Sequence, residues 1–307
     1  MQNPVVFIIF NRPETTEKVF AKIREAQPPR LFVIADAPRP NRASDLEHCH
    51  AARAVIERVD WDCEVLTNFA EENLGCRRRI SSGLDWVFSQ TEEAIILEDD
   101  CVPHPAFFRF CEELLDRYRD DQRVMHIGGT NYQFGRQRFP YSYYFSRYNH
   151  CWGWATWRRA WKSFDVEMKL WPELRDRGLL NDIFRDARAV ADWQRAFQMV
   201  YEKRIDSWAY CWTLSCWAQS GLTVLPNVNL ISNIGFDEAG SHTRNRHSRF
   251  ANMAIGNLEF PLQHPSFVIR DDEADQYTQR NNFRRSLIAR LGSYLLRAAA
   301  DRKARQS

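Results

Sequence analysis

The sequence has no long apolar run, and this absence excludes several classes of protein. No stretch approaches the ~18 consecutive apolar residues that a membrane-spanning helix needs. The N-terminus also lacks the charged and apolar regions of a secretory signal peptide, because the apolar run at residues 5–10 is only as long as a strand. We therefore expect a cytoplasmic protein.

The sequence also has little net charge and no cysteine pattern of a metal site. Its 42 Lys and Arg residues against 40 Asp and Glu give a formal charge of +2, which does not indicate a nucleic-acid partner. The eight cysteines include no CxxC pair and no zinc-ligand spacing, so we expect reduced, mostly packed thiols. No glycine-rich phosphate loop follows the first apolar run, where the chain has Asn11-Arg12-Pro13-Glu14.

The most informative feature present is a short apolar run, residues 95–97, that ends in Glu98-Asp99-Asp100. Such a run predicts a buried strand of a parallel sheet, and ligands of open α/β sheets bind at the carboxyl edge. Adjacent carboxylates resist burial unless a cation or sugar hydroxyls meet them. Oxygen ligands of this kind suit Mg²⁺ or Mn²⁺ carrying a diphosphate. A solvated acidic loop is the alternative.

The first 130 residues alternate strand and helix patterns, which predicts a parallel sheet with crossover helices. Strands are predicted at residues 5–10, 31–35, 63–66, 95–97, 124–127, 141–148 and 222–225. Helices are predicted from Pro13, after Gly75, at 107–118, at 154–161 and at 208–219, and an Asn-rich loop extends to about Asn245. We expect a main domain over residues 1–260 and a C-terminal extension over residues 261–307.

The C-terminal extension carries a basic amphipathic pattern from Arg280 onward. Phe283, Leu287 and Leu291 recur at helical spacing among many arginines, and Asp301 is the only acid there. Such a helix can lie peripherally on the anionic inner membrane, or pack its apolar stripe on the domain or on a second copy of the chain. The pattern leaves both uses open.

Tryptophan is abundant, with 11 residues in the chain, six of them between Trp152 and Trp193. Because sugar rings stack their C–H faces on aromatic rings, this richness suits a carbohydrate site, and core packing is the alternative.

The order of these motifs resembles that of bacterial family-2-like GT-A glycosyltransferases, which are related to the inverting β-1,2-N-acetylglucosaminyltransferase I. The matching pieces are residues 7–12, 34–36, 98–100 with 105–108, Gly153-Trp154, 208–226 and Ser241-His242. The resemblance implies a Rossmann-like α/β fold with a mixed, mainly parallel sheet and flanking helices. It also implies metal-dependent transfer of a hexosyl or N-acetylhexosaminyl group, with inversion, from a UDP-sugar to a bacterial surface glycan, with Mn²⁺ or Mg²⁺ as cofactor.

The resemblance further implies roles for individual residues on the donor side. It assigns Asn11 and Arg12 to the nucleotide and Asp36 to the uracil ring, because a carboxylate can accept a hydrogen bond from the N–H group of that ring. In the acidic motif, it assigns the metal to Asp100 and the ribose to Asp99. Glu98 is assigned to a sugar hydroxyl or to support of these contacts.

Three further donor-side candidates come with alternatives. Arg77 and Arg78 open a helix after Asn73-Leu74-Gly75 and are candidates to bind the diphosphate, although a solvated basic helix start is the alternative. His242 matches a segment that closes over the diphosphate in relatives, whereas a lone histidine is more often structural. On the acceptor side the resemblance places Gly153, Trp154 and Trp208.

The general base of an inverting transfer is the piece that this sequence lacks. The base takes the proton of the acceptor hydroxyl and lies in a Trp-Asp segment of related enzymes, whereas this chain has Ser207-Trp208-Ala209-Tyr210. Ala209 cannot accept a proton. One alternative is a variant that was inactivated at Ala209, and a single Asp-to-Ala change at the base position favours it. Another is an enzyme whose base is Asp206, Asp192 or Glu202. The remaining alternatives are a silent nucleotide-sugar or glycan-binding relative and a sugar nucleotidyltransferase, against which the missing glycine-rich loop counts.

Overall fold

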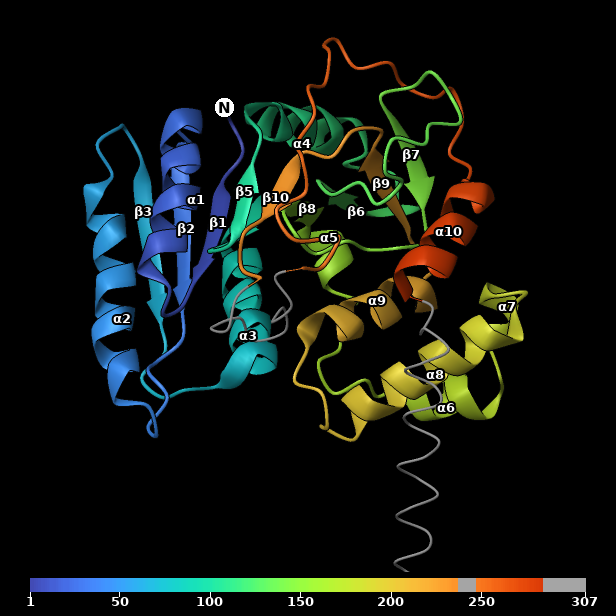
Figure 1. Ribbon diagram of the computed structural model, residues 1–307, viewed down its shortest axis with the longest axis horizontal. Coiled ribbons are helices and arrows are strands. Elements are labelled where there is room, and N and C mark those ends of the chain that lie inside the picture. The colour runs from blue at the N-terminus through green and yellow to red at the C-terminus, as the bar shows by residue number, and fades with distance from the viewer. Residues whose placement is uncertain (237–246, 284–307) are drawn as a thin grey trace, which may run out of the picture.

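The computed structural model describes residues 1–236 and 247–283, which fold around one large mixed sheet (Figure 1). The strand order is β3-β2-β1-β4-β8-β6-β9-β7. These strands are β1 (Val5–Ile9), β2 (Arg30–Ala35), β3 (Glu64–Phe69), β4 (Glu93–Glu98), β6 (Val124–Gly128), β7 (Tyr143–Ser146), β8 (Trp154–Trp157) and β9 (Leu222–Pro226). A small second sheet pairs β5 (Cys101–Pro103) antiparallel with β10 (Ile231–Asn233).

Helices flank both faces of the large sheet. The first half contains α1 (Pro13–Ala26), α2 (Ala43–Ala54), the 3₁₀ turn η1 (Val55–Arg58), α3 (Gly75–Gln90) and α4 (Pro105–Arg117). The second half contains α5 (Arg158–Trp161), α6 (Trp171–Asp176), α7 (Leu180–Ile183), α8 (Ala187–Tyr201), α9 (Trp208–Ala218), α10 (Asp272–Thr278) and the π-helical turn η2 (Gln279–Phe283). In Figure 1, α6, α8 and α9 lie together below the second half of the sheet.

Each face of the sheet carries its own apolar layer. Along β1, Val5, Phe7 and Ile9 contribute to one layer, while Val6 and Ile8 contribute to the other. Side chains alternate between the two faces of a strand, so a strand covered on both sides has an unbroken apolar sequence. This burial on both faces explains why the central strands could be predicted from the apolar runs of the sequence.

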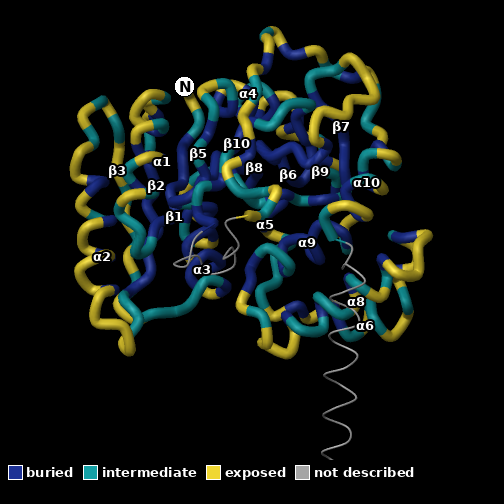
Figure 2. Tube along the Cα trace, viewed as in Figure 1, coloured by how far each residue is buried: buried dark blue, intermediate teal, exposed yellow. Residues whose placement is uncertain are grey.

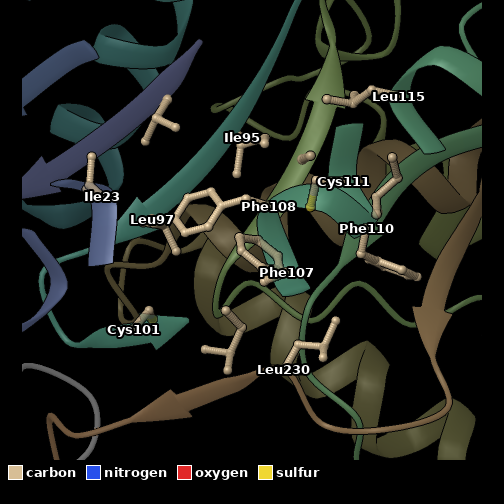
Figure 3. Close-up of a cluster of buried hydrophobic side chains, with 14 of the residues drawn as sticks. Ile23, Ile95, Leu97, Cys101, Phe107, Phe108, Phe110, Cys111, Leu115 and Leu230 are labelled. Carbon is tan, nitrogen blue, oxygen red and sulfur yellow. The ribbon is translucent and has the colours of Figure 1, made fainter. Parts of the chain in front are cut away.

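Helix α4 shows how the amphipathic patterns dock on the sheet. Phe107, Phe110, Cys111 and Leu115 are fully buried and pack with Leu97 of β4 in the layer that Figure 3 shows. Burial of each such side chain stabilises the fold by about 1.5–3 kcal/mol. The helices predicted at residues 107–118 and after Gly75 are confirmed as α4 and α3, and α3 buries Ile80, Leu84, Val87 and Phe88 in the same way.

The predicted fold class, a mixed and mainly parallel sheet with flanking helices, is confirmed. Strands β1 to β4 pair in parallel, as do β6 and β9, whereas β8 is antiparallel to both β4 and β6. The helix predicted at residues 154–161 is wrong in its first half, because residues 154–157 form β8. All four residues of β8 are buried at the centre of the sheet, where pairing on both sides overrides local helical preference.

The described part of the C-terminal extension packs against the free edge of β7. Arg270 forms a β-bridge with Phe145, and Asp275 of α10 accepts hydrogen bonds from Ser146 Oγ at 2.5 Å and from the Arg147 amide at 3.2 Å. The basic amphipathic helix predicted further on lies, from residue 284, outside the described residues. Within the described ranges, no helix is long and apolar enough to cross a membrane. Figure 2 shows that burial concentrates in the central strands, while α2 and β3 are the more exposed end.

Candidate functional site at the carboxyl edge of the sheet

The acidic motif lies where β4 ends, beside the end of β1. The two strands are parallel neighbours with Ile8 opposite Glu98. Arg12, at the start of α1, therefore lies next to Asp99 and Asp100, which form the turn into β5. This is the edge at which open α/β sheets bind ligands.

Arg12 links the two aspartates. Its Nη2 donates to Asp99 Oδ1 at 2.5 Å and to Asp100 Oδ2 at 3.0 Å. Burial acts to lower the pKa of Arg12, but attraction to both carboxylates raises it overall, so the guanidinium stays charged. The other terminal nitrogen, Nη1, is buried and has no hydrogen-bond partner among the described residues. A buried unpaired donor costs about 1–3 kcal/mol, so an oxygen of a ligand would be stabilised there.

Glu98 and Asp99 hold their protons more strongly than ordinary carboxyl groups do. Burial, and then repulsion from Asp100 and Asp99, raises the pKa of Glu98. Burial also raises the pKa of Asp99, against the attraction of Arg12. Glu98 is partly exposed, and its carboxyl group accepts no hydrogen bond from the described residues. An acidic group that is unpaired and repelled by its neighbours favours a cation in front of it.

Strand β10 and the turn after it bring two residues against Asp100 that were not predicted from the sequence. Asn233 is paired with Cys101 in the small sheet, and its Nδ2 donates to Asp100 Oδ1 at 3.3 Å. A Cβ atom on Gly235 would lie 2.1 Å from Asp100 Oδ2 and 2.6 Å from Arg12 Nη1, so only glycine allows this close approach. The Asn-rich loop after β9 was the available signal in the sequence.

The carboxylate of Asp36 is fully engaged by the start of α3. Its Oδ1 accepts from the amides of Ala37 and Leu74, and its Oδ2 accepts from the Gly75 amide and from Asn73 Nδ2, at 2.9–3.2 Å. A carboxylate has about four acceptor positions, and all of them are used. Burial raises the pKa of Asp36, and these hydrogen bonds oppose the rise. Asp36 thus accepts the hydrogen bonds of the first amides of α3, and the uracil contact implied by the resemblance stays a prediction.

A second carboxylate, Asp206, lies at the same helix start. Its Oδ1 accepts from the Arg77 amide at 3.2 Å, and its Oδ2 would be 2.9 Å from a Cβ on Gly75, which has a φ of +76°. Asp206 is exposed. Burial, and then the charges of Glu98 and Asp206, raises the pKa of the Cys76 thiol, which therefore lies near both carboxylates. Asp206 and Glu98 are thus both within electrostatic range of the Cys76 thiol.

Three other donor-side candidates are placed less directly. Arg77 is buried and donates through Nη1 to the Val200 carbonyl at 3.0 Å and through Nη2 to a second backbone carbonyl, so it joins α3 to the region around α8. Arg78 is exposed on α3. Asn11 donates to buried Asp45 of α2 at 2.9 Å. Arg77 and Asn11 therefore have structural contacts that explain their presence without a ligand.

The candidates on the acceptor side lie in the core. Trp154 and Trp208 are buried and stack on each other, with ring centroids 5.3 Å apart, so neither ring offers a face to a sugar. Gly153 has a φ of +59°, and a Cβ there would lie 2.3 Å from Ile231 Cδ1. Close packing between β8 and β10 accounts for this glycine.

The structure describes all the residues from which a general base was expected. Ala209 lies in the first turn of α9 and packs on the apolar layer beneath the sheet. Asp192 lines a groove of about 140 Å³ with Tyr210, and Glu202 is exposed just after α8. His242 lies outside the described residues. Of these three carboxylates, Asp206 is the one whose charge, together with that of Glu98, raises the pKa of the Cys76 thiol.

The acidic edge fits a divalent cation that takes most of its ligands from a bound diphosphate. Mg²⁺ is usually held by one or two carboxylates plus substrate phosphates. Glu98 and Asp100 can supply those carboxylates, whereas the residues described contain no group of three or more His, Cys, Asp or Glu that could hold a metal ion. The protein alone therefore offers an open site and no closed cage.

Comparison with known proteins gives weak similarities to solved structures. Residues 1–349 of S. aureus TarS align at 10% identity over 74% of this chain and 58% of that one, with a TM-score of 0.39. Galactosyltransferase LgtC with donor and acceptor sugar analogues aligns at 11% identity over 57% and 64%, with a TM-score of 0.32. UDP-glucose pyrophosphorylase with UDP-glucose aligns at 8% identity over 43% and 64%, with a TM-score of 0.25.

Each of these solved chains is matched over only part of its length. The chain spans about 58–64% of the length of these three solved chains. No family model matches the chain. No curated protein matches it either.

Proposed function

We propose that this chain is a glycosyltransferase that binds a nucleotide sugar, with UDP as the expected nucleotide, at the carboxyl edge of its sheet. The observation that carries the proposal is the arrangement of Glu98, Asp99 and Asp100 at the end of β4, with Arg12 bridging the aspartates. A diphosphate carries oxygens that suit both the unpaired Arg12 Nη1 and a cation in front of Glu98 and Asp100.

The residues of this edge would stabilise the departing nucleoside diphosphate. When bound, Mn²⁺ or Mg²⁺ would neutralise charge that develops on the leaving group. Arg12 supplies a fixed positive charge at the same place, because its pairing with two carboxylates keeps it ionised. Gly235 leaves the space above Asp100 and Arg12 free of a side chain.

We assign the general base of an inverting transfer to Asp206. The base must accept a proton from the acceptor hydroxyl as that oxygen attacks the anomeric carbon. Asp206 is exposed and is oriented through one oxygen by the Arg77 amide, and Gly75 leaves room beside the other oxygen. Asp206 lies three residues before Ala209, so it is close in the chain to the position where relatives are expected to carry the base.

One observation favours a second candidate function. Ala209 packs its methyl group on the core, so the chain is well folded with no carboxylate at the expected position. A nucleotide-sugar or glycan-binding protein without catalysis would have this combination. The acceptor, a bacterial surface glycan, and any contact with the inner membrane stay predictions, since the basic tail lies outside the described residues.

Donor binding is tested by thermal shift and calorimetry with a panel of nucleotide sugars, with and without Mn²⁺. A ligand at 100 times its Kd stabilises the folded state by about 2.7 kcal/mol. Asp100→Asn should remove metal-dependent binding. Asp116→Asn is the matched control, because Asp116 is an exposed carboxylate on α4 paired with Arg119. Absence of any nucleotide-sugar binding by the parent protein would refute the proposal.

Catalysis is tested separately with Asp206→Asn, which keeps an oxygen for the Arg77 amide. If Asp206 is the base, transfer and donor hydrolysis should fall by about 10²–10⁴ while donor affinity stays unchanged. Glu202→Gln should leave both unchanged. If the parent binds donor but transfers nothing, and Ala209→Asp restores transfer, the chain is the inactivated or silent form.

A further inference from the structure

We propose that the C-terminal segment, residues 284–307, docks its apolar stripe in a groove between α8 and α9 of the same chain. These two helices pack side by side below the sheet (Figure 1). The groove has a volume of about 140 Å³. The described part of the chain ends in it. Its lining includes Trp193, Ala196 and Met199 of α8, Ile205 of the following loop, Tyr210 of α9 and Phe283.

Two anchored residues bring the chain to this groove. The side-chain oxygen of Gln279 accepts hydrogen bonds from Trp193 Nε1 at 2.9 Å and from the Tyr148 hydroxyl group at 2.8 Å. Four residues later, the centroid of the Phe283 ring lies 5.0 Å from that of Trp193 and 5.2 Å from that of Tyr148. Residue 284 therefore begins at the groove, and the segment needs no long connection to reach it.

The sequence after Phe283 continues the apolar face that this residue begins. Leu287, Leu291, Tyr294 and Leu295 recur at helical spacing from it. Such residues share one side of a helix, so a helix that starts with Phe283 in the groove would present Leu287 and Leu291 to the same surface. An isolated helix of about 15 residues is marginal in water, and packing of its apolar face would stabilise it.

The chemistry of the groove suits this apolar stripe. Ala196, Met199 and Ile205 are apolar residues that are partly exposed. An apolar cavity of ~150 Å³ accommodates a benzene ring, so the groove has room for one leucine side chain. The charged residues of its lining, Asp192 and Arg195, have opposite signs, so the lining carries no net charge that would attract a basic face. The leucines of the segment therefore fit the groove better than its arginines do.

Docking would also hold the loop between α8 and α9. Residues 202–207 form this loop, and Ile205 is the one that lines the groove. A leucine side chain packed on Ile205 would restrict the loop and, with it, the neighbouring residue Asp206. The inference requires only the groove and the segment, so it does not rest on the proposed function.

The test is hydrogen–deuterium exchange of the full chain, read by mass spectrometry over residues 284–298. In the parent protein we expect exchange at least about tenfold slower than in a synthetic peptide of residues 284–307, the scale set by burial of one leucine side chain. Met199→Glu and Leu287→Glu each place a charge at the contact and should restore the rate of the free peptide. Gln194→Glu is the matched control, because Gln194 is exposed on α8 outside the lining, and it should leave the protection unchanged.

Three results would overturn the inference. The first is exchange at the rate of the free peptide in the parent, even if vesicles of phosphatidylcholine and phosphatidylglycerol slow it, which would assign the stripe to a membrane surface. The second is protection that rises with protein concentration, which would assign it to a second copy of the chain. The third is unchanged protection in both Met199→Glu and Leu287→Glu.

Discussion

Replacement of Arg12 by methionine tests the charge balance of the acidic edge. Methionine keeps much of the side-chain volume but removes the cation that Asp99 and Asp100 share. The three side chains are only 19%, 5% and 10% exposed, so solvent screens the uncompensated carboxylates poorly. Breaking a buried ion pair by removing one partner costs about 3–5 kcal/mol of unfolding free energy, and we expect a loss in this range at pH 8.

The loss should shrink as the pH falls. The pKa of Asp99 is already raised in the folded protein with Arg12 present, and without Arg12 it rises further. A carboxyl group with a higher pKa in the folded than in the unfolded state takes up protons on folding. Stability therefore falls as the pH rises through the window between the two values. Near pH 5 the folded variant carries a protonated Asp99, and its deficit relative to the parent should be smallest.

The assay is urea unfolding followed by tryptophan fluorescence at pH 5, 6.5 and 8. Arg24→Met is the matched control, because Arg24 pairs with Asp60 and both side chains are about half exposed, at 49% and 51%. An exposed pair contributes about 0–1 kcal/mol. Equal losses in the two variants, or an Arg12→Met deficit that does not change between pH 5 and 8, would refute the reasoning.

Three further variants extend the test of this edge. Glu98→Gln removes a group whose pKa is raised by burial and by the neighbouring carboxylates, so it should increase the urea midpoint at pH 9 and leave it unchanged at pH 5, where Glu98 is protonated. Asp36→Ala frees the first amides of α3 and should cost about 1–2 kcal/mol by urea unfolding, whereas a lost preference for UDP over ADP in calorimetry would support the uracil contact. Gly235→Ala must displace Asp100 or Arg12 and should weaken metal-dependent UDP binding at least tenfold by calorimetry, while Gly256→Ala, whose added methyl group would meet the side chain of Val228 at 3.1 Å, should not change it.

The sequence alone determined the parallel half of the fold. Unbroken apolar runs such as residues 5–9 and 94–97 occur because these strands are covered on both faces, so their pattern does not depend on detailed packing. The end of such a run also locates the carboxyl edge, which is why Glu98, Asp99 and Asp100 could be placed there from the sequence. Helices α3 and α4 were also predictable, because the residues that each helix buries against the sheet recur at the helical period.

Tertiary structure decided what the individual polar residues contact. Asp36 follows a strand, as a ligand-binding acid would, yet the amides of α3 occupy it, and these amides come from residues 38–39 positions away in the chain. Asp206 reaches the same helix start from 129 positions away, and Asn233 reaches Asp100 from 133 positions away. Local periodicity carries no information about such pairings.

The aromatic residues show the same division. Their abundance was visible in the sequence, but whether a ring meets a sugar or the core depends on neighbours from distant segments. The segment at residues 154–157 became a central strand because β4 and β6 pair with it on both sides, and this buried Trp154 against Trp208. Composition determined that this protein is rich in large rings, and only the packing of the sheet decided which of them a ligand can reach.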